Sequence, residues 1–192
     1  MSVAVVVLGL AMAALPETAG PLGYPMVRVP AGEFVRGCTP GQVGFCHKSE
    51  KPAHPVSLTR GIWVGRTEVT QALYAEVMGS SPHHFKGCGD TCPVESISWF
   101  DAVRFANALS EREGLEACYT IDGNSVGWPK GLACTGYRLP AEAEWEYAAR
   151  SRGKRITYPW GNQEATCRYA VMDDGGDGCT ADLHGEARQG TG

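Results

Sequence analysis

The sequence predicts an α+β domain that is rich in loops, and three observations support this fold class. Two segments, residues 98–114 and 137–150, have the periodicity of amphipathic helices. Only short stretches alternate apolar and polar residues as strands do. With 25 Gly and 12 Pro among 192 residues, turns and loops are expected to separate these elements throughout. The length fits a single domain that can bury a real core.

Short strands are expected in the first third of the chain. Residues 24–34 (YPMVRVPAGEF) alternate apolar and polar and then break at Gly, and residues 56–69 (VSLTRGIWVGRTEV) predict one or two further strands. Residues 70–79 (TQALYAEVMG) have helical spacing, with Thr suited to cap the first turn and Gly to end the helix. The Gly-, Pro- and charge-rich residues 38–55, and residues 80–93, are expected to be loops.

The clearest predicted helix is SWFDAVRFANALSEREG, residues 98–114. Ser98 can accept a hydrogen bond from the first turn, and Asp101 stands at the answering position of a capping box. Gly114 is suited to end the helix. One apolar stripe repeats at helical spacing and is expected to face the core: Ala102, Phe105, Ala106 and Leu109.

The second long helix is predicted within YRLPAEAEWEYAAR, residues 137–150. Pro140 suits a helix entry. Its apolar face is expected to hold Trp145, Ala148 and Ala149. Glu142, Glu146 and Arg150 follow at four-residue spacing, which is the common pattern for ion pairs along a helix. The alternative interpretation makes Glu142 and Glu146 a general acid and base.

The first twenty residues differ from the rest and predict a secretion signal. An uncharged apolar run extends from Val3 to Leu15, which is too short to span a membrane comfortably. Residues 11–13 (Ala-Met-Ala) supply a small-x-small cleavage pattern, although no Lys or Arg precedes the run. We therefore expect a secreted or periplasmic protein, with no membrane span after the signal, residues 1–20, is removed. A buried first strand is the alternative.

Cysteine usage also favours an oxidising compartment. The even number and high density predict disulfides formed by Cys38, Cys46, Cys88, Cys92, Cys118, Cys134, Cys167 and Cys179. We expect local pairs that each close a turn-rich loop: Cys38–Cys46, Cys88–Cys92, Cys118–Cys134 and Cys167–Cys179. Zinc is the main competitor, but only Cys88 and Cys92 are spaced like a metal knuckle, and no second pair matches them.

Composition and net charge limit the classes of binding partner that the chain is expected to have. Hydrophobic residues make up 43% and charged residues 20% of the chain, which is typical of a globular protein. The formal charge is −4 and no basic run exists. These values argue against nucleic acid or an anionic membrane surface as a main partner.

Five stretches, taken in order, together resemble one family. They are VRVPAGEFVRG, EKPAHPVSLTRGIWVGRTEVTQALYAEVM, CPVESISWFDAVRFANALS, YRLPAEAEWEYAAR and YPWG. The chain resembles the sulfatase-modifying factor family, the formylglycine-generating enzymes, over residues 26–172, within a domain of residues 24–192. The resemblance implies the loop-rich formylglycine-generating variant of the C-type-lectin-like fold. The residues that carry this structural signature are Trp99, Asp101, Arg138, Glu142, Glu144, Trp145, Glu146 and Trp160.

The resemblance also implies an activity. Members of this family use copper and oxygen to oxidise a sulfatase cysteine to formylglycine. The resemblance therefore implies a protein or peptide substrate. Their copper cysteines lie after a Gly-Asn-x-Trp-Glu-Trp segment and near an Arg-Gly-Gly-Ser-Trp segment, neither of which occurs in this sequence. We therefore expect an incomplete domain, truncated at its C-terminus, that has no catalytic or copper-binding residue and is inactive alone. The alternative is a non-catalytic C-type-lectin-like binding module.

The segment MDDGGDG presents a possible calcium site. Family members bind calcium through loops in this region, and hard cations prefer carboxylate and carbonyl oxygens. Asp173, Asp174 and Asp177 are the possible ligands. The alternative is a solvated turn, because Asp and Gly are common in turns for reasons of backbone conformation.

Overall fold

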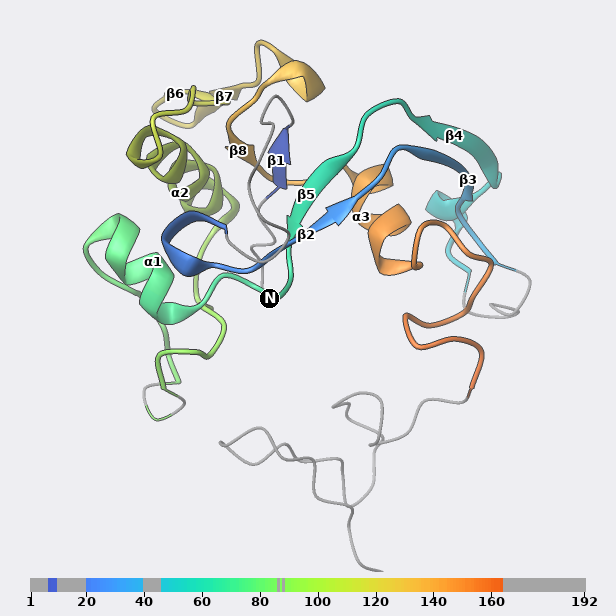
Figure 1. Cartoon of the computed structure of the whole chain (residues 1–192), viewed down its shortest axis with the longest axis horizontal. Helices are drawn as coiled ribbons and strands as arrows, with labels where there is room; N and C mark the ends of the chain where they lie inside the picture. The colour runs from blue at the N-terminus through green and yellow to red at the C-terminus, as the bar shows by residue number, and fades with distance from the viewer. Residues whose placement is uncertain (1–6, 10–19, 40–45, 86, 88, 164–192) are drawn as a thin grey trace, which may run out of the picture. The chain divides into compact units, whose positions relative to one another are not determined.

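The computed structural model describes residues 7–9, 20–39, 46–85, 87 and 89–163 (Figure 1). The chain divides into two compact units. The first unit consists of Met1–Glu33 and Val56–Trp145, and the second of Phe34–Pro55 and Glu146–Gly192. Helices and strands are mixed, with long connections between them, so the predicted α+β class is confirmed.

A four-stranded sheet forms the centre of the first unit. Its strands are β2 (Met26–Val29), β5 (Ile62–Gly65), β1 (Val7–Gly9) and β8 (Tyr137–Arg138), in that order across the sheet. All three strand pairs are antiparallel. The short β-rich stretches of the sequence provide β2 and β5, and in β2 the two end residues are buried while the two central ones are exposed.

Strand β1 lies within the segment that the sequence predicts to be a secretion signal. Residues 7–9 pair with β5 on one side and with β8 on the other, with Leu8 opposite both Trp63 and Tyr137. A strand here is the alternative that the sequence left open for this segment. Residues 1–6 and 10–19 lie outside the described part of the chain. Removal of the segment on export stays a prediction.

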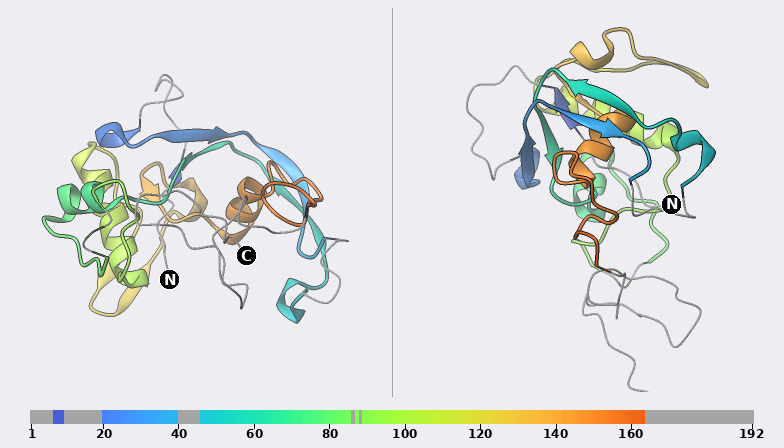
Figure 2. Two further views of the ribbon diagram at one scale, coloured as in Figure 1. Left: turned by 90° about the horizontal axis from the view of Figure 1, so that it is seen from below. Right: turned by 90° about the vertical axis from the view of Figure 1, so that its right-hand side faces the viewer.

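Helices α1 (Gln71–Met78) and α2 (Trp99–Arg112) lie side by side in the first unit (Figures 1 and 2). Both begin at caps that the sequence predicts. The Thr70 side chain accepts a hydrogen bond from the Leu73 N–H, and Ser98 and Asp101 form the reciprocal capping box. Gly79 ends α1 at a φ of 81°, which is a left-handed conformation that suits Gly.

The core of the first unit lies between these helices and the sheet. The rings of Tyr74 in α1 and Phe105 in α2 stack with their centroids 5.2 Å apart. The predicted stripe of α2 is fully buried, which confirms the face assigned from its spacing. Further buried members are Tyr24, Met26, Trp63, Val69, Leu73, Val94, Val103, Cys118, Tyr119, Cys134 and Tyr137.

A hairpin of β6 (Thr120–Asp122) and β7 (Ser125–Gly127) follows α2, and the short 3-10 helix η3 (Gly131–Ala133) comes after it. The sequence did not predict these elements. The Cys118–Cys134 disulfide closes the loop that contains them, in agreement with the predicted local pair. Within the described part of the chain, no helix has the length and apolar character needed to cross a membrane.

The second unit contains most of β3 (Gly32–Arg36), the start of β4 (His54–Leu58), the 3-10 helix η2 (Lys48–Glu50) and the second half of α3 (Glu142–Ala149). Strands β3 and β4 form a two-stranded sheet. Arg150 donates a hydrogen bond to the Val35 carbonyl oxygen, 3.0 Å away, and another to Glu146 at 2.5 Å. The Glu146–Arg150 pair is the ion pair that the four-residue spacing predicts.

Glu116 should make stability depend on pH in the acid range. The pKa of Glu116 is lowered from 4.5 to about 2. The largest cause is its hydrogen-bonded ion pair with Lys130, and the Thr135 N–H and hydroxyl add to the effect. A lowered folded-state pKa stabilises the protein above pH 4.5, and this stability is lost as the pH falls from 4.5 towards 2.

In urea unfolding at pH 2–6, we therefore expect Glu116→Gln to lower stability at pH 6 and to make its decline below pH 4.5 less steep. The matched control is Glu111→Gln in the last turn of α2. Its stability should fall with decreasing pH as steeply as that of the parent protein. Parallel stability curves for Glu116→Gln and the parent would contradict the prediction.

Candidate functional site

The centre of the site is a buried ion pair between Arg138 of β8 and Glu144 of α3. Two parallel hydrogen bonds, both 2.7 Å, join the Arg138 Nη1 and Nη2 atoms to the two carboxylate oxygens of Glu144. Arg138 is 1% exposed and Glu144 is 5% exposed. A bidentate pair of this kind is both strong and geometrically specific.

Local sequence places the two partners. Residues 137–144 form a short strand, a Leu-Pro turn and the start of a helix. The carboxylate of Glu144 can therefore bend back over the first turn of that helix. There its Oε2 atom also accepts the Ala141 N–H at 2.8 Å, which satisfies one of the free donors at the helix start. The RLPAEAE part of the signature thus builds one buried connection between β8 and α3.

A second network fixes β8 from the side of α2. The Ser110 hydroxyl donates to the Ala106 carbonyl oxygen and accepts the Tyr137 N–H at 2.7 Å. Asn107 bonds the backbone N–H and carbonyl of Tyr119, whose hydroxyl oxygen accepts the Leu139 N–H at 3.0 Å. Burial raises the pKa of the Tyr119 hydroxyl, so this group stays neutral at physiological pH.

A cavity of about 270 Å³ lies against the ion pair in the first unit. Its walls are residues 57–62, Leu132, Ala133, Arg138 and Glu144. The ring of Trp128 covers the Arg138 guanidinium, with its centroid 5.5 Å away. The sequence did not predict this cavity, because its walls come from segments that are far apart along the chain.

Arg138 has hydrogen-bonding capacity left. Its guanidinium carries five N–H donors. Two serve Glu144 and one serves the Leu139 carbonyl oxygen at 3.1 Å. The Nε atom is buried and has no hydrogen-bond partner in the described structure. Buried polar groups are nearly always paired, so this Nε atom is an exception within the site.

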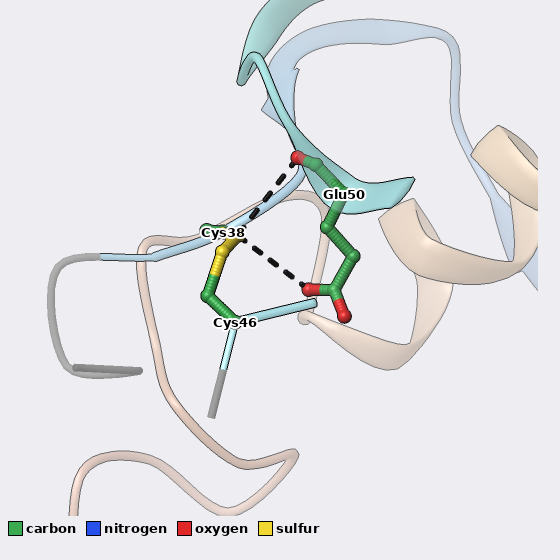
Figure 3. Close-up of side chains that lie close together, drawn as sticks. All are labelled: Cys38, Cys46 and Glu50. Carbon is green, nitrogen blue, oxygen red and sulfur yellow. Dashed lines mark hydrogen bonds between the residues drawn. A yellow bond between two sulfur atoms is a disulfide. The ribbon is translucent and has the colours of Figure 1, made fainter. Parts of the chain in front are cut away.

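A different cluster lies in the second unit, where Cys38, Cys46 and Glu50 meet (Figure 3). The two cysteines form a disulfide with Cα atoms 5.7 Å apart, in agreement with the predicted local pair. The Cys38 Sγ atom lies 3.7 Å from the Glu50 Oε2 atom. Thiolates, rather than disulfide sulfurs, are the strong metal ligands. In its oxidised form the cluster is therefore a structural loop closure.

The described cysteines decide whether this part of the chain offers ligands for copper. Cys38, Cys46, Cys92, Cys118 and Cys134 are all disulfide-bonded, and the described residues include no free cysteine. Copper(I) prefers soft thiolate ligands, which a disulfide does not supply. The described cysteines therefore do not fit a copper site. Cys88, Cys167, Cys179 and the predicted calcium ligands Asp173, Asp174 and Asp177 lie outside the described residues.

The other signature residues have local structural contacts. The Ser98 hydroxyl and N–H lower the pKa of Asp101, which holds the start of α2. Trp160 stacks on Tyr158 in the YPWG turn, with ring centroids 4.9 Å apart. Trp99 and Trp145 are 52% and 56% exposed, so the expected apolar face of α3 is wrong at Trp145. The buried face of α3 instead includes Glu144 and Tyr147, because the ion pair turns the helix that way.

The fold and the site define a class of protein: a loop-rich α+β domain built around the Arg138–Glu144 pair of the RLPAEAEWEYAAR signature. Residues 13–177 match the family model described as "Sulfatase-modifying factor enzyme 1-like domain". The chain belongs to this family, and the fold is of the formylglycine-generating type, as the resemblance implies.

Individual relatives agree with this assignment. The chain is 35% identical over 135 residues to the "Chaperone protein LppX" of Paenibacillus barcinonensis, covering 62% of this chain and 48% of that protein. It is 34% identical over 161 residues to the "Formylglycine-generating enzyme" of Streptomyces coelicolor, covering 71% and 50%. The solved structure of "Treponema denticola variable protein 1" matches with a TM-score of 0.58 and 29% identity, covering 77% and 59%. The chain thus spans about half the length of these two curated relatives.

Proposed function

We propose that this chain is an exported member of the formylglycine-generating family that does not oxidise a sulfatase cysteine by itself. The observation that carries the proposal is the oxidised state of every described cysteine, which leaves no thiolate pair for copper there. What the described residues do supply is a scaffold, held by the Arg138–Glu144 pair and the Cys118–Cys134 disulfide. A protein or peptide partner is part of the same proposal, by analogy with the family.

The copper-loaded protein should therefore give no formylglycine. The test incubates the purified chain with a Cys-x-Pro-x-Arg peptide and copper, and follows loss of the thiol and gain of the aldehyde by mass spectrometry. The expected signal equals that of a copper-only blank, because side chains alone provide no one-electron path to oxygen. Turnover above the blank would overturn the proposal, and Cys167 and Cys179 would then be the first residues to mutate.

Export has a separate test. The N-terminal apolar run, which contains Ala-Met-Ala, and the disulfides both support passage into an oxidising compartment. We expect residues from Met1 to about Ala13 to be missing from the mature protein. N-terminal sequencing of protein recovered from the secreted or periplasmic fraction checks this. A cytosolic protein that begins at Met1 would contradict both the signal and the proposed compartment.

A second candidate function, a non-catalytic binding module, is favoured by one observation. The cavity of about 270 Å³ combines the apolar side chains of Leu58, Ile62 and Leu132 with the polar side chains of Ser57, Thr59 and Arg60. Ligand sites commonly combine an apolar concave surface with a few polar groups that fix orientation. This function does not require copper and is compatible with a chain that lacks oxidase activity.

A further inference from the structure

We propose that the exported protein, once its signal is removed, accepts an extended apolar strand of another polypeptide between β5 and β8. In the full chain β1, residues 7–9, fills this slot and pairs with both strands (Figure 1). The predicted signal contains these residues, so its cleavage would vacate the slot. The inference therefore rests on the export proposed above, and it names the kind of partner that the chain would take.

The slot is one strand wide. Strand β1 is antiparallel to both of its neighbours, with Leu8 opposite Trp63 of β5 and Tyr137 of β8. Neighbouring strands in a sheet lie about 4.8 Å apart, so the backbones of β5 and β8 are roughly 10 Å apart. That separation is too wide for β5 and β8 to pair directly, and it admits one extended strand without rearrangement of the sheet.

Both walls of the slot are held from behind. Strand β5 pairs with β2 on its other edge. On the far edge of β8, the Ser110 hydroxyl accepts the Tyr137 N–H at 2.7 Å. The Tyr119 hydroxyl accepts the Leu139 N–H there at 3.0 Å. Since backbone N–H groups alternate between the two edges along a strand, the Arg138 N–H points into the slot. Strand β8 can therefore add a strand only on the side that faces β5.

Removal of β1 would leave two facing strand edges unpaired. Backbone N–H and C=O groups in the interior of a protein are nearly always hydrogen-bonded, and losing a partner costs free energy. An unpaired strand edge is also a ready template for another chain. A strand that enters this slot gains hydrogen bonds along both of its edges, whereas a strand added to an ordinary sheet edge gains them along one. Backbone pairing therefore favours an extended peptide as the occupant.

The slot also selects the side chains of its occupant. Residues directly opposite each other in an antiparallel pair point their side chains to the same face of the sheet. Trp63 and Tyr137 belong to the core, so an occupant residue between them should be large and apolar. The flanking positions lie opposite Ile62 and Arg138, which are 4% and 1% exposed, so a charged side chain would find little water there. The expected partner is an uncharged apolar stretch without proline.

The first experiment compares protein recovered from the secreted or periplasmic fraction, with its N-terminus sequenced, and the full chain. The probe is the peptide KKAVVVLGLKK, which carries residues 4–10 of this sequence between solubilising lysines. Isothermal titration calorimetry should show saturable binding to the cleaved protein. Binding to the full chain should be at least about tenfold weaker, because β1 already occupies the slot. Equal binding to both forms, or no binding to the cleaved form, would overturn the proposal.

Changes in the probe separate backbone pairing from side-chain burial without altering the protein. Proline at the position of Leu8 cannot donate to the sheet and should weaken binding at least about tenfold. Aspartate at that position keeps the N–H but brings a charge into the core, and it should also weaken binding at least about tenfold. Aspartate at the position of Ala4, outside the paired residues 7–9, should leave the affinity unchanged. A probe that tolerates both changes at the Leu8 position would contradict insertion as a strand.

Amide hydrogen exchange locates the bound strand. The Arg138 N–H should exchange faster in the cleaved protein than in the full chain, and the probe should restore its protection. The Tyr137 N–H, which bonds to Ser110 on the far edge, is the internal control and should stay protected throughout. Exchange at Arg138 that the probe leaves unchanged would overturn the location, whether another segment, a second copy of the chain or nothing fills the slot.

The outcomes also distinguish this inference from the function on which it rests. An N-terminus at Met1 would defeat the export proposal and this inference together. A cleaved protein that does not bind the probe would defeat only this inference. Neither result depends on oxidase turnover, so both are separate from the copper assay.

Discussion

Replacing Glu144 with Ala is expected to destabilise the first unit by about 3–5 kcal/mol, because the change leaves the Arg138 charge buried without its partner. The guanidinium would lose two of its three hydrogen bonds while remaining 1% exposed. The Ala141 N–H at the start of α3 would also lose its acceptor. Folded domains are typically stable by only about 5–15 kcal/mol, so the variant should be close to unfolding at room temperature.

The matched control is Glu76→Ala, which removes the same side chain from an exposed ion pair. Glu76 accepts from Arg112 at 3.1 Å, and its side chain is 48% exposed. Exposed pairs contribute about 0–1 kcal/mol, so urea unfolding should separate the two variants clearly. If Glu144→Ala lowered the free energy of unfolding less than Glu76→Ala does, the Arg138–Glu144 pair would not have the structural role assigned to it.

The sequence alone was informative where structure is set by neighbours along the chain. The capping box of α2 needs only Ser98 and Asp101, three residues apart, and both of its hydrogen bonds form. Helical spacing likewise identified the buried face of α2, because its apolar stripe from Ala102 to Leu109 spans about two turns. Disulfide pairs that close short loops were also accessible, since little chain has to be rearranged to form them.

The site itself was not accessible from spacing. Glu144 pairs with a residue six positions earlier, across the turn between β8 and α3, while the helix pattern drew attention to Glu142, Glu146 and Arg150. The cavity joins residues 57–62 to residues 132–144, and nothing local connects these segments. The signature includes Arg138 and Glu144, but their bidentate geometry needed three-dimensional placement.

Removing the Cys118–Cys134 disulfide is the second change with a large expected effect. The bond closes a loop of sequence separation 16, and for loops near this length the loss of unfolded-state entropy corresponds to about 3 kcal/mol. Both sulfurs are in the core, with each cysteine 1% exposed. The double variant Cys118→Ala/Cys134→Ala should therefore lose about 3 kcal/mol or more in urea unfolding, because small cavities add to the entropic term.

The double variant Cys38→Ala/Cys46→Ala provides the control. It opens a shorter loop, of separation 8, whose cysteines are only partly buried. Both features predict a smaller loss of stability, on the order of 2 kcal/mol. A control that loses more than the Cys118–Cys134 variant would contradict the assignment of the stronger structural role to the core disulfide.

The core disulfide should also affect the cavity. The loop that it closes carries Trp128, which covers the Arg138 guanidinium, and Leu132 and Ala133, which line the wall. Opening the loop in the Cys118→Ala/Cys134→Ala variant should let these residues move away and change the environment of the Arg138 guanidinium. The ¹H–¹⁵N signals of the Arg138 side chain should then shift at temperatures where the variant is still folded, as judged by circular dichroism. Unchanged signals in the folded variant would show that packing against α2 and β8, rather than the disulfide, holds this wall in place.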